Sequence, residues 1–337
     1  MRRIGKGTVL LLVFLFFMAG LGVQRIYAAE PEITLRYAGN LPINHFITKS
    51  QEFFAKRVME RTNGKVKVEV FPAGQLFSDK DMLRALPSGA VDIGEVFCPQ
   101  WTGIVPLWIY WDLPLLFRDR EHWHRVADTE VGEMMKEAPL EKHAGFRVLY
   151  WMHAGGTGFA TKQSIRSLED FKGKRIRGVG EIVLEGIKAM GGSPVFMGGG
   201  EVYMALQRGT IDGANSLIAS FASRKYYEVT KYLACNDWNF GMAVTLINEK
   251  KWESLPPDVQ KEILGAAEEA KIWTRKASEE ADMDSLNLLK EKGMTFFDLR
   301  GEERKKWREA CKPLQDYYIE RAGEKAKTIL EIGERVR

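Results

Sequence analysis

Apolar and polar residues alternate in short runs, and stretches with helical spacing separate these runs. Alternation of period two occurs at 33–39 (ITLRYAG), 65–71 (KVKVEVF) and 174–180 (KRIRGVG), and each run predicts a strand. Helical spacing follows at about 47–62 and about 182–190. Strands that alternate with helices predict an α/β protein with parallel sheets and right-handed crossovers.

The longest helical pattern follows the sequence SLPPDVQ and runs from about Pro257 to Gly293 with hardly a breaker. A helix of roughly 35 residues is about 50 Å long, which is enough to span two lobes. The alternative is an ordinary surface helix that is interrupted at Gly265 or near Met283.

Two segments of the chain resemble each other weakly. VFPAG at 70–74 precedes a helical stretch that ends in ALPSGAVD at 85–92, and VFMGG at 195–199 precedes one that ends in ALQRGTID at 205–212. Both segments predict a strand, a glycine turn, a helix, a glycine and a short strand. The shared pattern A-L-x-x-G-x-[VI]-D favours two related lobes over a chance similarity.

The N-terminal segment has the order of a secretory signal peptide. Three basic residues among the first six precede an apolar run at 8–23, and two alanines follow at 28–29. We expect residues 1–29 to be removed on export to the periplasm. The alternative is a retained anchor, but the run is shorter than the roughly 20 apolar residues of a membrane span.

Removal of this segment changes the net charge. The whole chain has 49 basic and 45 acidic residues and a net charge of +4, and the segment holds four basic residues (Arg2, Arg3, Lys6 and Arg25) and no acid. The exported chain therefore has 45 of each and a net charge of zero, which favours neither nucleic acid nor an anionic membrane as a partner.

The length that remains suggests two lobes. We expect lobe 1 to comprise residues 30–152 plus about 242–280. We expect lobe 2 to comprise residues 153–241 plus about 281–337, including the end of the long helix and the C-terminal helices. Three scattered cysteines are too few for a disulfide framework.

The strand at 174–180 carries two arginines on one face, although a buried strand is usually apolar. Ligands of parallel α/β sheets lie outside the carboxyl ends of the strands. Arg177 lies at that end, whereas Arg175 lies about 6 to 7 Å further back. Only Arg177 is therefore expected to reach a cleft.

Enzyme motifs are not apparent in the sequence. H-E-x-x-H, G-x-S-x-G and a nucleotide-binding G-x-x-x-x-G-K-[ST] loop do not occur. HWH at 122–124 puts two imidazoles at i and i+2, on different sides of a helix, which argues against a metal site. A hydrolase that uses Cys98 is one alternative, and a sensory module that presents its ligand to a membrane receptor is another.

Five motifs in order carry a resemblance that covers nearly the whole exported chain. They are NGKVKVEVFPAGQLFSDKDMLRALPSGAVDIG, DLPLLF, SLEDFKGKRIR, GGSPVFMGGGEVYMALQRGTIDGAN and SLPPDVQKEI. In sequence and spacing the chain resembles the solute-binding subunit of tripartite ATP-independent periplasmic (TRAP) transporters, the DctP family. The resemblance implies two α/β lobes of a type II-like periplasmic binding protein, hinged around a cleft and braced by a long helix. It also implies a non-enzymatic protein without cofactor that passes a small organic acid to TRAP membrane subunits. The sequence does not determine the oligomeric state, and we expect a monomer.

The resemblance assigns the central ligand contact to Arg177, the second arginine of the K-[IV]-R strand motif. A guanidinium is always charged and binds a carboxylate through two parallel hydrogen bonds. The alternative is a structural ion pair with an acid of the other lobe. Asn215 and Ser216 follow TIDG where some relatives hold a metal with an acid, so no metal is expected in the cleft. The segment 153–162 lacks the arginine that many relatives have, which favours a monocarboxylate.

The resemblance also nominates weaker ligand contacts in both lobes: Gln100, Trp101, Trp238, Phe159, Asn40 and His45. We assign Trp108 and Trp111, which lie beside DLPLLF, to packing rather than to the cleft.

Overall fold

The structure is a computed structural model that describes residues 31–234 and 237–336. The expected signal peptide at 1–29 and Cys235 therefore lie outside the described residues. None of the helices in the described part of the chain is both long enough and apolar enough to cross a membrane.

The strands belong to one continuous mixed sheet. They are β1 (Ile33–Ala38), β2 (Val66–Phe71), β3 (Ile93–Phe97), β4 (Phe146–Thr161), β5 (Arg175–Gly178), β6 (Ser193–Phe196), β7 (Gly213–Leu217), β8 (Tyr232–Ala234), β9 (Phe240–Asn248) and β10 (Thr295–Phe297). The main order is β2-β1-β3-β9-β4-β7-β5-β6, and β8 pairs with β4 and with β10 beside it. The strands expected at 33–39, 65–71 and 174–180 are thus confirmed as β1, β2 and β5.

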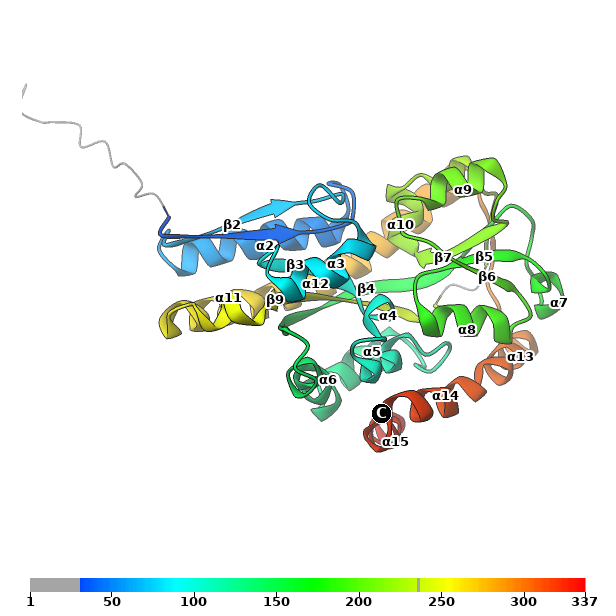
Figure 1. Cartoon of the computed structure of the whole chain (residues 1–337). Helices are drawn as coiled ribbons and strands as arrows, with labels where there is room; N and C mark the ends of the chain where they lie inside the picture. Colours follow the sequence, from blue (N-terminus) through cyan, green and yellow to red (C-terminus); the bar gives the residue numbers. More distant parts are fainter. Residues whose placement is uncertain (1–30, 235–236, 337) are drawn as a thin grey trace, which may run out of the picture.

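The helices cover both faces of this sheet, and the C-terminal helices lie below it in the view of Figure 1. They are α2 (Phe46–Arg61), α3 (Asp79–Ser88), α4 (Cys98–Trp101), α5 (Arg120–Ala127), α6 (Glu130–Glu141), α7 (Leu168–Phe171), α8 (Glu181–Ala189), α9 (Val202–Arg208), α10 (Ile218–Ser223), α11 (Glu249–Glu253), α12 (Pro257–Glu291), α13 (Gly301–Cys311), α14 (Pro313–Ala322) and α15 (Glu324–Arg335), with 3₁₀ helices η1 (Pro106–Asp112) and η2 (Tyr226–Glu228).

Two lobes divide the sheet, and both are visible in Figure 1. Lobe 1 contains β1, β2 and β3, which pair in parallel, and lobe 2 contains β5, β6 and β7, which do the same. The long strands β4 and β9 run through the middle, antiparallel to each other and to β3 and β7. The parallel sheets expected from the sequence are therefore present within each lobe, and the two crossing strands join them.

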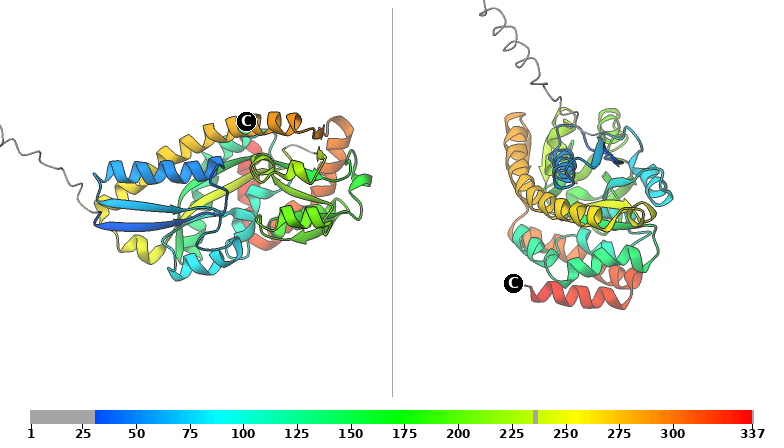
Figure 2. Two further views of the ribbon diagram at one scale, coloured as in Figure 1. Left: turned by 90° about the horizontal axis from the view of Figure 1, so that it is seen from above. Right: turned by 90° about the vertical axis from the view of Figure 1, so that its left-hand side faces the viewer.

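The long helix α12 is continuous over 35 residues, as the pattern predicted. Figure 2 shows it running along most of the length of the molecule, past both lobes. Its buried positions recur every three or four residues, and they change from apolar between Val259 and Ala270 to mostly polar between Thr274 and Ser285. The helix contacts α2 in lobe 1, α10 in lobe 2 and β4 between them. It therefore braces the two lobes along one side.

The crossing strand β4 is irregular where it passes from one lobe to the other. Its register with β9 shifts between His153 and Gly156. Asp282 of α12 accepts a hydrogen bond from the Gly156 amide at 2.9 Å, so the helix is fixed to the strand at this irregularity. The expected lobe boundaries at 152/153, 241/242 and 280/281 fall inside β4, β9 and α12, and they stay a prediction.

The two segments that resemble each other adopt the same succession of elements. Helix α3 ends before Gly89 (φ 79°) and α9 ends before Gly209 (φ 75°), and each is followed by a parallel strand. This left-handed conformation favours glycine, which explains the shared glycine in both segments. The relation between the lobes is therefore visible in the backbone as well as in the sequence.

The C-terminal helices complete the core below the sheet. Helices α13, α14 and α15 pack on η1, α6, α7 and α8, and Tyr318 donates a hydrogen bond to the Leu107 carbonyl at 3.2 Å. Trp108 and Trp111 are fully buried in this region, which confirms their assignment to packing. Cys98 and Cys311 are both buried and unpaired.

Candidate functional site

Arg177 is a buried cation at the carboxyl end of β5. Its side chain is held by two backbone carbonyls, because Nε donates to Met197 at 3.0 Å and Nη1 donates to Asn215 at 2.8 Å. The residue is 3 % exposed, and burial lowers the pKa of its guanidinium. Within residues 31–234 and 237–336 no carboxylate forms an ion pair with it. The anchored guanidinium thus carries a charge that no acid of the described chain neutralises.

Arg175 has a different environment on the same strand. Its guanidinium pairs with Asp212 at 2.8 Å, and its backbone amide donates to the same carboxylate at 2.9 Å. Lobe 1 repeats this arrangement, since the Arg36 amide donates to Asp92 at 2.8 Å. Both arginines also donate to the backbone carbonyl two or three residues before the aspartate. Arg175 is therefore a structural residue that ties β5 to the segment leading into β7.

A cavity between the lobes lies in front of Arg177. Its walls come from the carboxyl ends of β1, β3, β5 and β7 and from the helices or loops that follow them, which agrees with the position expected for ligands of parallel sheets. The lining residues are Asn40, Leu41, Asp79, Phe97, Pro99, Gln100, Asp112, Thr157, Arg177, Val179, Val183, Gly199, Asn215, Ser216, Leu217, Ser220, Arg224, Asn239 and Gly241.

The lining contains a buried acid, Asp112. Asn239 donates to its Oδ1 at 3.2 Å, and Oδ2 is buried without a hydrogen-bond partner in the described residues. Burial raises the pKa of the Asp112 carboxyl well above its usual value, which favours the protonated form. A protonated carboxyl can donate a hydrogen bond, and Asp112 therefore offers a donor to a polar group in the cavity.

A second guanidinium, that of Arg224, lines the same cavity. Arg224 follows α10 in lobe 2, and its Nη2 donates to the Asn40 carbonyl of lobe 1 at 3.0 Å. No ion pair of Arg224 occurs in the described part of the chain, whereas Asp79 contributes one carboxylate to the lining. Arg224 could not be nominated from the sequence, because no motif surrounds it and it lies 47 residues beyond Arg177.

The structure brings five of the nine residues nominated from the sequence to this cavity. Those that line it are Arg177, Asn215, Ser216, Gln100 and Asn40. The side-chain amide of Asn215 also donates a hydrogen bond to the Gly158 carbonyl at 3.2 Å, so it helps to hold the cavity wall together.

The placement expected for the three aromatic residues needs correction. Trp101, Trp238 and Phe159 are fully buried in the hydrophobic core and do not belong to the cavity lining. Trp101 packs edge-on against Phe146, and Phe159 packs against Trp238. These large rings fill the space behind the walls of the cleft, where their burial stabilises the fold.

His45 also lies outside this cavity. It is the N-cap of α2, where its Nδ1 accepts a hydrogen bond from the Ile47 amide at 3.2 Å. Burial lowers the pKa of its imidazole to about 3, so the ring is neutral near pH 7. It lines a separate hollow between α2, α10 and α12. His45 is thus placed as a helix cap rather than beside Arg177.

Contacts between the lobes lie at the rim of the cavity. Lys80 of lobe 1 lies 3.5 Å from Glu201 of lobe 2, and the Gly199 amide donates to Asp79 at 3.3 Å. Gly180 of lobe 2 approaches Pro99 of lobe 1 so closely that an added Cβ would lie 1.9 Å from the Pro99 carbonyl oxygen. The described conformation therefore has the two lobes in direct contact around the cavity.

Glu95 is a buried acid of β3 beside this site. It is 1 % exposed and accepts a hydrogen bond from the Asn40 amide at 2.9 Å. Burial raises the pKa of its carboxyl from 4.5 to about 7, although the bond from Asn40 lowers it. Because the folded-state pKa is raised, its stabilising contribution is complete below about pH 4.5 and is lost as the pH rises through about 7.

Glu95→Gln is therefore expected to reduce the loss of stability between pH 5 and pH 8. Relative to the wild type, the free energy of unfolding of the variant should gain about 2.5 kcal/mol over this interval, since each pKa unit corresponds to about 1.4 kcal/mol and part of the change lies below pH 5. Urea unfolding at several pH values measures the effect. Glu253→Gln, at an exposed position, should follow the wild-type profile. Parallel profiles for Glu95→Gln and the wild type would contradict the prediction.

The chain matches the family described as "Bacterial extracellular solute-binding protein, family 7" over residues 37–321. It is 31 % identical over 285 residues to the C4-dicarboxylate-binding periplasmic protein DctP of Rhodobacter capsulatus, and the match covers 83 % of this chain and 84 % of that protein.

Solved structures of periplasmic solute-binding proteins have the same fold. The TRAP solute-binding protein from Sulfurospirillum deleyianum with bound succinate is 30 % identical, with a TM-score of 0.84, and the match covers 91 % of this chain and all of that one. The TRAP solute-binding protein from Desulfovibrio salexigens with bound orotic acid is 27 % identical, also with a TM-score of 0.84, over 89 % of this chain and 97 % of that one.

Proposed function

Because the chain belongs to bacterial extracellular solute-binding protein family 7, the DctP family, we propose that it captures a small organic acid between its lobes and delivers it to TRAP membrane subunits. The similar proteins with bound succinate and bound orotic acid support a carboxylate as the solute. Export to the periplasm, which the N-terminal segment predicts, agrees with this role.

The observation that carries the proposal is the unpaired charge of Arg177. A buried charge is costly unless an opposite charge and hydrogen bonds compensate it. The two carbonyls that bind Nε and Nη1 fix the guanidinium, which lines the cavity, and Nη2 has no hydrogen-bond partner among the described residues. A carboxylate that enters the cavity supplies both the missing charge and acceptors for a charge-assisted hydrogen bond. We therefore assign Arg177 as the anchor of the solute.

The charges around the cavity favour a monocarboxylate with a second polar group. Arg177 and Arg224 contribute two positive charges and Asp79 one negative charge, while burial favours the neutral form of Asp112. The sum of one positive charge matches a singly charged anion. Arg224 and Asp112 lie in the same cavity as donors, so an oxo or hydroxyl group on the solute would find partners there.

Binding fits the cavity better than hydrolysis by Cys98 does. The thiolate is the nucleophilic form of cysteine. Cys98 is fully buried, and burial raises the pKa of its thiol well above 9.0, so the thiolate is disfavoured. The residue does not belong to the lining of the cavity.

The proposal is tested by a thermal-shift screen of organic acids, together with mass spectrometry of any acid retained through purification. At about 100 times its Kd, a solute should raise the free energy of unfolding by about 2.7 kcal/mol and Tm by about 5 °C. Oxo acids, hydroxy acids, succinate, orotate and sugar acids form the first panel, with the corresponding amides as neutral controls. A shift with neutral amides or sugars but with none of the acids would contradict the proposal.

Arg224→Gln tests the second polar contact. We expect it to lower the affinity for the best acid of the screen by about 10- to 100-fold, the usual range for a hydrogen bond to a charged group. The analogue without the oxo or hydroxyl group should lose less, because it lacks the acceptor. Calorimetry with both compounds gives the ratio of their affinities. If the variant leaves this ratio unchanged, Arg224 contacts the protein rather than the solute.

A further inference from the structure

A cluster of charged and imidazole side chains lies between α5 and α12, outside the lining of the interlobe cavity. Two of its arginines have acidic partners: Arg120 pairs with Asp282, and Arg275 pairs with Asp128 through Nη2 and Oδ1 at 2.7 Å. These pairs leave the remaining acids of the cluster without a cation of their own.

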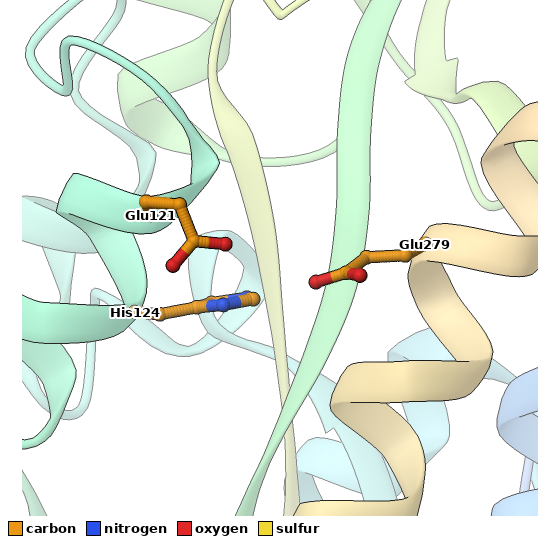
Figure 3. A group of neighbouring side chains, drawn as sticks. All are labelled: Glu121, His124 and Glu279. Atoms are coloured by element: carbon orange, nitrogen blue, oxygen red, sulfur yellow. The ribbon is translucent and has the colours of Figure 1, made fainter.

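The acids that remain are Glu121 on α5 and Glu279 on α12. Neither forms an ion pair within the described ranges 31–234 and 237–336. His124 lies on α5 three residues after Glu121, and Figure 3 shows its ring pointing toward Glu279 beside the Glu121 carboxylate. The ligand atoms of the three side chains lie within 4.8 Å of one another. Two like charges therefore face each other across an imidazole.

His124 supplies a second observation that is independent of the two acids. The residue is 8 % exposed, and its Nε2 is buried with no hydrogen-bond partner in the described part of the chain. Burial, followed by the charge of Arg275, lowers the pKa of the ring to about 4, so the imidazole is neutral near pH 7. A neutral imidazole is the form that binds metal ions.

We propose that Glu121, His124 and Glu279 bind a divalent cation of the zinc type. Glutamate and histidine at i and i+3 present both side chains on one face of a helix, as in metal sites of helical bundles. The third ligand comes from the facing helix, and water completes the coordination. Around a tetrahedral zinc ion, ligand atoms lie about 3.4 Å apart, so the two exposed glutamates need only small rotations to close the site.

The donor set distinguishes between classes of cation. Calcium takes six to eight oxygen ligands, whereas one imidazole and two carboxylates suit zinc and neighbouring transition metals. After the arginine–aspartate pairs are formed, the two glutamates also carry the two negative charges that a divalent cation neutralises. The site therefore matches a zinc-type cation in ligand type and in charge.

Binding at this place would join α5 to the helix that braces both lobes. Asp282, three residues beyond Glu279 on α12, bonds to the Gly156 amide at the irregularity of β4. The cation would therefore fix α12 next to the strand that crosses between the lobes. This role is separate from solute capture, since none of the three ligands lines the cavity in front of Arg177.

Calorimetric titration of Zn²⁺ into the mature, tag-free, chelator-treated protein tests the inference. We expect one zinc ion per chain, no competition by Ca²⁺ at the same concentration, and a higher Tm in the presence of zinc. Glu121→Gln and Glu279→Gln should each weaken zinc binding at least tenfold, because each removes a charged ligand while keeping its size. Both positions are exposed, so these variants should fold.

Two control variants separate this site from adventitious binding. Glu280→Gln changes the adjacent exposed acid of α12, and His143→Gln removes an exposed histidine elsewhere, and both should bind zinc as the wild type does. No binding of zinc by the wild type at about 100 μM would overturn the proposal. Unchanged affinity in Glu121→Gln and Glu279→Gln would overturn it as well, as would a loss of binding in His143→Gln alone.

Discussion

Arg177→Ala is expected to lower the affinity for the solute by about 30-fold to several thousandfold while the protein stays folded. Truncation of one partner of a desolvated, hydrogen-bonded charge pair costs about 2 to 5 kcal/mol, and each 1.4 kcal/mol is about tenfold in affinity. The fold should tolerate the change, because the side chain brings a buried charge that has no acidic partner within the described residues. Arg177→Lys should recover little, since an ammonium group cannot reproduce the planar arrangement of donors.

Arg175→Ala is the matched control for this experiment. It removes a guanidinium two residues away on the same strand, but that guanidinium faces Asp212 and is about half exposed. The variant should bind the solute nearly normally and lose at most about 1 kcal/mol of stability. Calorimetry with the acid found in the screen compares the three variants, after circular dichroism has shown that each is folded. Loss of binding in Arg175→Ala with retention in Arg177→Ala would contradict the assignment.

Gly180→Ala is expected to weaken solute binding by about 5- to 150-fold without touching the solute. Its Cβ would lie 1.9 Å from the carbonyl oxygen and 2.3 Å from the carbonyl carbon of Pro99, in the other lobe. Backbone atoms cannot move aside as a flexible side chain can, so the lobes must separate. Overpacking of this kind costs about 1 to 3 kcal/mol, and this cost falls on the conformation in which the lobes touch.

The position at Gly103 provides a control for Gly180→Ala. An added Cβ there meets no atom within 4 Å, so Gly103→Ala should bind the solute normally. Small-angle scattering with and without solute provides a second readout. The wild type should become more compact on binding, and Gly180→Ala should stay more extended at the same concentration. Equal scattering curves and equal affinities for Gly180→Ala and the wild type would show that the lobes need not meet at this point.

Much of the fold could be predicted from the sequence because its signals are local. The alternation in KRIRGVG predicted a strand with Arg177, and not Arg175, near its carboxyl end, as in β5. The helical spacing after SLPPDVQ predicted one continuous helix from Pro257. The crossing strands were harder to predict, since β4 pairs with β9 and β7 across gaps of many residues. Such pairing depends on contacts between residues far apart in the sequence. The periodicity of one segment predicts the type of element but not its pairing partner.

The candidate site was predictable only in part. Arg177, Asn215 and Ser216 lie at strand ends, where topology alone brings them to the cleft. Trp101 and Trp238 were misplaced because the sequence nominates an aromatic residue without saying which side of its segment faces the cavity. Arg224 had no motif around it, and its position depends on the turn that follows α10.

The proposed zinc ligands show the same limit more clearly. The two histidines of HWH are spaced at i and i+2, which puts them on different sides of α5. The relevant spacing is i and i+3, from Glu121 to His124, and the third ligand lies 155 residues further along the chain at Glu279. Only the tertiary fold, which brings side chains of α5 and α12 together, places that acid beside the other two.

The paired arginine–aspartate contacts of the two lobes imply an order of events during solute capture. Arg36 and Arg175 occupy equivalent places, so the lobe 1 counterpart of Arg177 is Ala38, which has no charge to offer. We therefore expect an incoming anion to dock on lobe 2 while the cleft is still open, before lobe 1 closes over it. In stopped-flow measurements, Arg177→Ala should slow association, whereas Gly180→Ala should mainly speed dissociation. We therefore expect lobe 2 to make the first contact with the solute and the closure of lobe 1 to set its residence time.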